Sequence, residues 1–402
     1  MLTKFINRSY ESVLKKYLVE NRQMIFIAGP RQVGKTTLCK KFSTNYINWD
    51  NQNHRQIILE GPDAIAETFG LNVLKENQRV IVFDKIHKYS KWKNFLKGFF
   101  DSYASQTKII VTGSSKLDIY QKGGDSLMGR YFLYRLHPLS VREIVNSTLD
   151  ECTIQKAKLI LPDSFNALYQ FGGYPEPFLK AKTRFFNQWR RLRNQQLLSE
   201  DVRDLTQIQE INQLEILSNL LIQQAGQLIN YSNLAQKINV SVDSIRRWLK
   251  VLESLYYCFT ISPWTFKVSR SLLKQPKIYL WDWSIIKDKG AKAENFVALH
   301  LLKAVHWWID NGYGEYRLHF LRDKEKREVD FLVSRDNQPW FLVEVKTGSS
   351  RKVSKSLYHF QELTQCKHAF QVSFSEDFVD ADCFSMDKPT IVPITTLMSQ
   401  LV

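Results

Sequence analysis

Several features that mark particular protein classes are absent from this chain of 402 residues. It contains no apolar run long enough to span a bilayer, and its N-terminus lacks the pattern of a signal peptide. The cysteines are scattered and odd in number, which excludes a disulfide framework or a cysteine metal site; they are Cys39, Cys152, Cys258, Cys366 and Cys383. We therefore expect a cytoplasmic protein with no membrane partner.

Acidic residues are also scarce relative to basic ones. The chain has 40 Asp and Glu against 56 Lys and Arg, a formal net charge of +16. Such a charge draws a protein to polyanions, nucleic acid first, although it also serves solubility alone. Hydrophobic residues make up 44% and aromatic residues 13%, which excludes a disordered chain. The length predicts two to four domains.

The most informative stretch runs from residue 25 to residue 38. A short apolar segment leads into Gly-x-x-x-x-Gly-Lys-Thr, and a helical pattern follows, which is typical of a phosphate-binding loop. Two glycines let the backbone N–H groups turn toward phosphate oxygens, the lysine reaches the β and γ phosphates, and the threonine hydroxyl holds Mg²⁺. The predicted ATP-binding residues are Gly29, Pro30, Arg31, Gln32, Val33, Gly34, Lys35, Thr36 and Thr37.

Three further apolar segments read as strands of the same parallel sheet, at residues 46–50, 80–84 and 108–112. Ligands bind at the carboxyl ends of such strands. We therefore predict that Asp84 joins Thr36 in binding Mg²⁺ and that Ser114 lies near the γ phosphate. Many ATPases of this type carry Glu directly after the strand-ending Asp. Here that residue is Lys85, which cannot act as a base while charged, so ATP binding is better supported than hydrolysis.

Arg130 follows a predicted turn after residue 126. Its guanidinium could neutralise the γ phosphate, in its own subunit or in a neighbour's within a homo-oligomer. The alternative is an ordinary surface arginine.

As an ordered set, these motifs resemble prokaryotic AAA-superfamily ATPases whose C-terminal half is a domain of unknown function with a nuclease-like tail. The resemblance spans most of the chain and implies that architecture, but that family usually carries Asp-Glu where this chain has Asp84-Lys85. The matching segments are residues 29–37, 112–115, 127–130, 138–140, 172–175 and 201–205, together with acidic motifs in the tail.

The middle of the chain predicts a helical connector followed by a winged helix. Residues 154–225 read as helices that break at residues 172–177, and a basic stretch from Lys180 to Arg193 is either a phosphate-contacting face or a solvated helix face. Residues 229–238 and 242–255 read as a helix-turn-helix with Ser241 as N-cap. Residues 256–261 and 277–281 would supply the wing strands, and the exposed side would carry Arg246, Arg247 and Lys250. Such a module binds DNA or serves as a docking element.

The tail contains two segments that predict a β-hairpin, residues 327–333 and 340–346, with a turn around residues 337–339. Glu344 and Lys346 point to one face of their strand, Asp330 can join them from its neighbour, and Glu294 is a fourth member from an upstream helix. This set resembles the PD-(D/E)xK nuclease fold. The resemblance implies that Asp330 and Glu344 bind Mg²⁺ and that Lys346 lies beside the attacking water.

We therefore predict an α/β protein with a P-loop AAA-type domain at 1–150, a helical connector at 151–226, a winged-helix-like domain at 227–285 and a restriction-endonuclease-like domain at 286–402. The preferred function is an ATP-binding ATPase that acts on or binds DNA, slow at hydrolysis because of Lys85, with Mg²⁺-dependent nuclease activity left open. The alternative is a nucleotide-gated switch that docks a protein partner, with an inactive nuclease fold.

Overall fold

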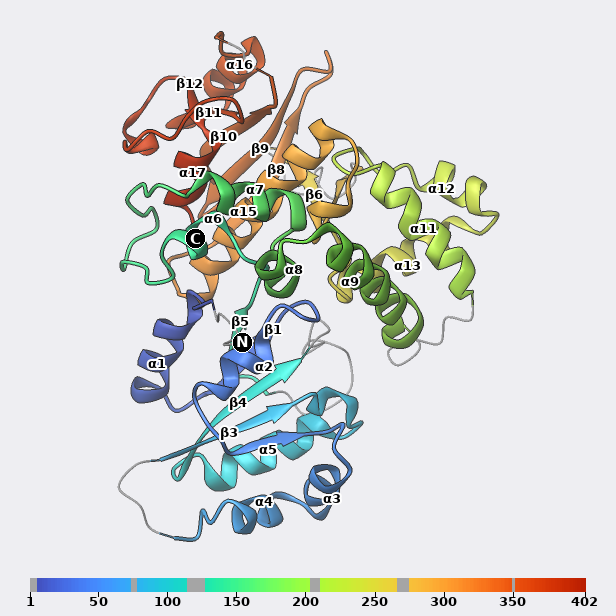
Figure 1. The fold of residues 1–402 in the computed structure, drawn as a ribbon, viewed down its shortest axis with the longest axis vertical. Coiled ribbons are helices and arrows are strands. Elements are labelled where there is room, and N and C mark those ends of the chain that lie inside the picture. Colours follow the sequence, from blue (N-terminus) through green and yellow to red (C-terminus); the bar gives the residue numbers. More distant parts are fainter. Residues whose placement is uncertain (1–5, 74–77, 114–126, 203–209, 266–274, 349–350) are drawn as a thin grey trace. The chain divides into compact units, whose positions relative to one another are not determined.

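The computed structural model describes residues 6–73, 78–113, 127–202, 210–265, 275–348 and 351–402 (Figure 1). The chain forms two compact units. One comprises residues 7–137, and the other comprises residues 138–402 with the first six residues of the chain.

The first unit is built on a five-stranded parallel sheet in the order β2-β3-β4-β1-β5. Its strands are short apolar runs, and β1 and β4 are buried nearly throughout because helices cover a parallel sheet on its faces. The elements are α1 (Tyr10–Glu20), β1 (Met24–Ala28), α2 (Lys35–Lys40), β2 (Tyr46–Asn48), α3 (Gln52–Glu60), α4 (Pro62–Thr68), β3 (Arg79–Asp84), a 3₁₀ turn (Ile86–Lys88), α5 (Trp92–Tyr103), β4 (Thr107–Gly113) and β5 (Tyr131–Arg135).

Aromatic side chains hold the helices of this unit to the sheet. Phe95 and Phe99, one turn apart on α5, both meet the ring of Phe83 on β3 edge to face. On α1, Tyr17 packs against Phe132 and Tyr134 of β5. Truncating a buried ring of this kind costs about 3–5 kcal/mol. The sequence prediction of an α/β fold with a parallel sheet is confirmed.

The second unit begins with helices and ends in a seven-stranded mixed sheet in the order β12-β11-β10-β9-β8-β6-β7. Its helices are α6 (Val141–Val145), α7 (Pro162–Phe171), α8 (Pro175–Lys180), α9 (Thr183–Gln195), a π-helical turn (Gln196–Asp201), α11 (Ile211–Gln223), α12 (Tyr231–Ile238), α13 (Val242–Ser254), α15 (Lys289–Asp310), α16 (Lys355–Thr364) and α17 (Ile394–Gln400). Its strands are β6 (Cys258–Pro263), β7 (Lys277–Leu280), β8 (Tyr316–Arg322), β9 (Glu328–Arg335), β10 (Gln338–Lys346), β11 (His368–Ser373) and β12 (Thr390–Pro393).

The predicted hairpin in the tail is present as the antiparallel pair β9 and β10. Its turn lies at Asp336-Asn337, one residue earlier than expected. Both residues have positive φ, 49° and 63°, the geometry of the two-residue turns that suit twisted hairpins.

The predicted wing strands belong to this same sheet. β6 and β7 pair antiparallel, as expected for a hairpin, but the end of β6 also pairs with β8 through Ser262 and Pro263. The expected boundary near residue 285 therefore does not separate two sheets. Hydrogen bonds between strands join residues that are distant in sequence, so amino-acid composition does not predict which strands pair.

His300 and Lys303 of α15 form a buried polar group with residues of α6. The His300 ring accepts from the Val141 N–H at Nε2, 3.2 Å away, and its Nδ1 lies 2.8 Å from the Phe296 carbonyl oxygen. Because the ring is buried near the Lys303 ammonium, its pKa falls to about 3. Lys303 in turn forms a buried ion pair with Glu143. Here the fold holds a neutral histidine.

Candidate functional site

The phosphate-binding loop has the backbone that its sequence predicts. Gly29 has a φ of 153°, and a Cβ there would lie 2.2 Å from the Leu136 carbonyl oxygen, so no larger residue fits. Gly34, with a φ of 100°, turns the chain into α2. Lys35 is buried, and its Nζ donates to the carbonyl oxygens of Gly29 and Pro30, both at 2.7 Å. The ammonium is thus held inside the curve of the loop.

Arg8, which the sequence analysis did not single out, lies just before α1 and holds this loop in place. Its guanidinium is buried and donates to the Val33 carbonyl oxygen at 2.6 Å and to the His137 carbonyl oxygen. The loop is therefore tied to the chain that follows β5. No local pattern around residue 8 would have revealed the contact, since its partners are 25 and 129 residues away.

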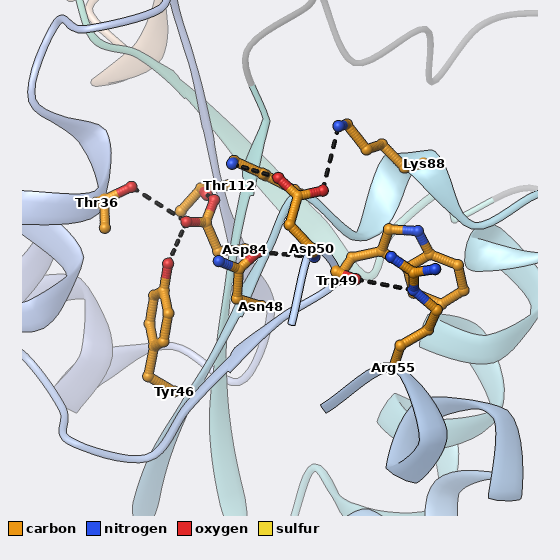
Figure 2. Close-up of polar contacts among 10 residues, drawn as sticks. Thr36, Tyr46, Asn48, Trp49, Asp50, Arg55, Asp84, Lys88 and Thr112 are labelled. Carbon is orange, nitrogen blue, oxygen red and sulfur yellow. Dashed lines mark hydrogen bonds and ion pairs between the residues drawn. The ribbon is translucent and has the colours of Figure 1, made fainter. Parts of the chain in front are cut away.

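Asp84, at the end of β3, is a hydrogen-bonding centre beside the loop. Figure 2 shows it among three hydroxyl groups, each of which donates to it: Thr36 at 3.1 Å, Tyr46 and Thr112. Burial and the bond to Asp84 raise the pKa of the Tyr46 phenol, so this hydroxyl stays protonated. The two predicted Mg²⁺ residues, Thr36 and Asp84, are therefore brought together. Tyr46 and Thr112 were not predicted to contact Asp84. They reach it because their strands, β2 and β4, pair with β3 on either side.

A second carboxylate, Asp50, lies just beyond β2. It pairs with Lys85 and also with Lys88, as Figure 2 shows for the latter. The Lys85 Nζ is 2.5 Å from one of its oxygens, and the Lys88 Nζ is 3.1 Å from the other. Although partial burial acts to raise the pKa of Asp50, the two lysines outweigh it and lower the pKa. Lys85 itself has a φ of 58° and anchors its N–H on the Thr112 carbonyl oxygen. The positive charge of Lys85 is therefore neutralised by Asp50.

Arg130 lies at the other end of the strands. It directly precedes β5, and Tyr131 pairs with Met24 at the start of β1, whereas the loop follows the end of β1. Its guanidinium makes two bonds with Asp101, at 2.8 and 3.0 Å. The expectation that Arg130 meets a γ phosphate in its own subunit is wrong, because parallel strands put the two at opposite edges of the sheet. Ser114 lies outside the described residues.

The acidic residues of the tail surround a lysine. Lys277, at the start of β7, is buried, and its Nζ lies 3.1 Å from a Glu294 oxygen, 2.5 Å from a Glu328 oxygen and 4.0 Å from an Asp330 oxygen. The Tyr279 hydroxyl donates to the same Glu294 oxygen at 2.7 Å. Burial acts to lower the pKa of Lys277, but the surrounding carboxylates outweigh it and raise the pKa. Lys277 therefore remains an ammonium.

The other predicted members of this site occupy the neighbouring strand. Glu344 and Lys346 on β10 pair with each other at 2.7 Å, and the Val345 N–H between them donates to Asp330 Oδ2 at 2.8 Å. Burial and the nearby charge of Glu294 raise the pKa of Asp330 to about 7. Pairing of β9 with β10 brings Asp330, Glu344 and Lys346 close together, and Glu294 approaches from α15. Lys277, which the sequence analysis did not single out, lies beside Glu294 and Asp330.

The residues around the two sites differ in how they suit Mg²⁺. Beside the loop, Thr36 and Asp84 offer adjacent oxygens of the kind that this cation prefers. In the tail, the ammonium of Lys277 lies 4.0 Å from Asp330, one of the two predicted metal ligands, and 3.1 Å from Glu294. Across the described ranges, no set of three His, Cys, Asp or Glu side chains is arranged to hold a metal ion. The tail cluster thus does not fit the ion that a nuclease would use.

Helices α13 and α9 carry the basic side chains that the sequence analysis singled out. On α13, Arg246, Arg247 and Lys250 are exposed, whereas Ile245 and Trp248 are buried. Ser241 caps this helix through the Ser244 N–H at 3.0 Å, as predicted. On α9, Phe186 and Trp189 are packed inward, and the exposed basic residues on and just before the helix are Lys180, Lys182, Arg184 and Arg191. Within the part of the chain that the structure describes, no helix is long and apolar enough to cross a membrane.

Comparison with known protein families bears on the first unit most directly. Residues 21–145 match the model of an AAA domain, and this segment contains the loop, Asp84 and all five strands of the parallel sheet. It is an AAA-type P-loop ATPase domain. Residues 162–289 and 289–397 match two models that are each described as a domain of unknown function, DUF8612 and DUF4143. Lys277 lies within the first of these, and the carboxylates around it lie within the second.

The relatives that match most of this chain by sequence include uncharacterized proteins of two bacteria. An uncharacterized protein of Mycobacterium tuberculosis is 23% identical over 83% of this chain and 72% of its own, and one of Haemophilus influenzae is 21% identical over 83% and 79%. Among solved structures, AMPPCP-bound DnaA from Aquifex aeolicus aligns with 63% of this chain and 89% of its own, at 14% identity and a TM-score of 0.32. A TM-score this low does not establish a shared fold over that length.

Proposed function

We propose that this protein binds ATP and Mg²⁺ at residues 29–37 and hydrolyses ATP slowly. The observation that carries the proposal is the arrangement of Lys35 inside the loop with Thr36 and Asp84 beside it. In this proposal Lys35 leaves its two carbonyl partners for the β and γ phosphates. Thr36 and Asp84 supply oxygens to Mg²⁺, which offsets the negative charge of the phosphates.

Slow hydrolysis follows from the groups near Asp84. A base or water-orienting carboxylate contributes roughly 10²–10⁴-fold in rate. At the position after Asp84 the chain carries Lys85, whose ammonium is paired with Asp50. A long-lived ATP-bound state suits a switch better than a motor, and we propose that ATP sets the state of the second unit.

We further propose that the partner is DNA. The support is a capped helix-turn-helix, α12 and α13, whose exposed side presents Arg246, Arg247 and Lys250, in a chain with a net charge of +16. We also propose that any contact between Arg130 and a γ phosphate is made across a subunit interface of a homo-oligomer.

A titration of ATP·Mg²⁺ into the protein by calorimetry tests the nucleotide site. Lys35→Ala removes charge-assisted hydrogen bonds to phosphate, each worth about 1.5–3 kcal/mol, and should weaken binding at least about tenfold. Lys15→Ala is the matched control, because Lys15 is an exposed lysine of α1 whose one ion pair among the described residues is with Glu11 in the same helix. Equal affinity in parent and Lys35→Ala, with both folded by circular dichroism, would refute the assignment.

A second candidate function is a nucleotide-gated switch that docks a protein partner and whose tail does not cut DNA. Lys277 favours it, because an ammonium among Glu294, Glu328 and Asp330 leaves the tail poorly suited to Mg²⁺. DNA binding that weakens steeply with added salt would support the first candidate. Absence of DNA binding at low salt, with ATP-dependent association to a protein, would support the second.

A further inference from the structure

The acid cluster of the tail is built from two strands and a helix that are distant in sequence. Lys277 comes from β7, Glu294 from α15, and Glu328 and Asp330 from β9. The ammonium has only 4% of its side chain exposed, against 20%, 28% and 18% for the three acids. It therefore lies deeper than the carboxylates that surround it, and water does not replace them as its partners.

Most carboxylate oxygens of this cluster already have a donor. Glu294 Oε1 accepts from both Lys277 and Tyr279, Glu328 is shared between Lys277 and Arg322, and Asp330 Oδ2 accepts from the Val345 N–H. On β10, Glu344 Oε1 is paired with Lys346. Glu344 Oε2 is buried and has no hydrogen-bond partner within the described ranges, and the nearest cation to Asp330 Oδ1 is Lys277, at 4.0 Å.

A divalent cation would have to compete for these oxygens. Mg²⁺ requires close to six oxygen ligands at about 2.0–2.1 Å in near-ideal octahedral geometry. The few oxygens without a donor do not supply that set, and a fixed positive charge 3.1 Å from Glu294 and 4.0 Å from Asp330 repels a second cation. The Lys277 ammonium, by contrast, already forms ion pairs with Glu294 and Glu328, at 3.1 and 2.5 Å.

We propose that Lys277 is the resident cation of this cluster. Its ammonium lies 4.0 Å from Asp330, one of the two residues that the nuclease resemblance assigns to Mg²⁺, and it pairs with Glu294 and Glu328 as well. The cluster then acts as an ionic clasp that joins β7, the partner of the strand β6 that follows the helix-turn-helix, to β9 and α15. It does not act as a metal site for phosphodiester cleavage. The inference is independent of nucleotide binding by the first unit.

Substituting Lys277→Met tests the clasp, since methionine keeps the length and removes the charge. The carboxylates left behind repel one another and should accept a divalent ion in place of the ammonium. We expect nucleotide-free Lys277→Met to bind one more Mn²⁺ per chain than the parent, measured by electron paramagnetic resonance. Its affinity should exceed that of the parent cluster at least about tenfold. Mn²⁺ should also raise its melting temperature more than that of the parent.

Two control variants make the result specific. Lys277→Arg keeps a positive charge and should bind no additional Mn²⁺, and Lys277→Met/Asp330→Asn should lose the site that the single change creates. Mn²⁺ held by Asp84 is common to all these proteins and cancels in the comparison. A Lys277→Met protein that gains no Mn²⁺ site would overturn the proposal.

The parent protein allows a second test, which can be carried out even if Lys277→Met does not fold. In the parent, Asp330→Asn should leave the number of bound Mn²⁺ ions unchanged, because the cluster holds none. Loss of a bound Mn²⁺ on this change would show that the cluster is a metal site and would overturn the proposal. Loss of ATP binding in Lys35→Ala has no bearing on either outcome, so the two proposals fail separately.

Discussion

Lys85→Glu should accelerate ATP hydrolysis. The change places a carboxylate directly after Asp84, which the resembled ATPases carry there and which orients or activates water. The expected gain is roughly 10²–10⁴-fold in kcat, equivalent to about 3–5 kcal/mol of barrier. The parent should accordingly turn over well below the roughly 10 s⁻¹ that is typical of enzymes.

The structure allows the cost of this change to be set against its gain. The Lys85 and Asp50 side chains are 33% and 36% exposed, so the ion pair that is lost is worth at most about 1 kcal/mol. Lys88 remains 3.1 Å from the other Asp50 oxygen and continues to neutralise it. The variant should therefore fold. A new glutamate would nevertheless lie near Asp50, and repulsion there could turn it away from the phosphates.

A charge-swapped protein removes that repulsion. Lys85→Glu/Asp50→Lys restores an oppositely charged pair with the acid at position 85, and it should hydrolyse ATP at least as fast as the single variant. Lys85→Met is the matched control: it removes the ammonium and adds no carboxylate, so its rate should stay close to that of the parent.

The assay is steady-state phosphate release at saturating ATP and Mg²⁺, with ATP affinity measured in parallel. A parent that hydrolyses ATP at an ordinary enzymatic rate would refute the reasoning. So would a Lys85→Glu protein no faster than Lys85→Met, since position 85 would then not limit the chemistry. Equal acceleration in both variants would mean that the ammonium inhibits and that the carboxylate adds nothing.

Three further predictions concern DNA binding, pH and the loop backbone. Changing Arg246, Arg247 and Lys250 together to Ala should flatten the salt dependence of DNA binding by about 3 in slope, if each contacts a phosphate; an unchanged slope would move the contact elsewhere. Because the pKa of His300 is about 3 in the folded protein and about 6.5 unfolded, stability falls below pH 6.5 by about 1.4 kcal/mol per unit. Chemical denaturation should show His300→Gln losing about 2–3 kcal/mol less than the parent between pH 6.5 and 4.5; an equal loss would contradict the assignment. Gly29→Ala should abolish ATP binding or lower the melting temperature of the first unit, because its Cβ would meet a backbone oxygen at 2.2 Å; a stable variant with parental affinity would contradict this geometry.

Much of the first unit could be predicted from sequence because its signals are local. The loop at residues 29–37 requires glycine at two positions and lysine at one, and short apolar runs mark the strands on either side. Parallel strands carry their carboxyl ends to one edge of the sheet, so Thr36 and Asp84 had to meet. The hairpin of the tail was likewise predictable, since alternation along β9 and β10 sets which side chains share a face.

What the sequence could not supply was the partner of each charge. Arg130 looked like a phosphate ligand until the register of β5 placed it with Asp101. From sequence, Lys85 indicated only that the usual glutamate is absent. The structure shows in addition that Lys85 pairs with Asp50, which follows β2.

Lys277 gave no signal of its own and became part of the acid cluster only because β6 joins the sheet of the tail and β7 pairs with β6. Local pattern determines which elements form and which face of each is apolar. The tertiary structure decides which distant ion completes a cluster, because that depends on strand order and register, which have no local signature.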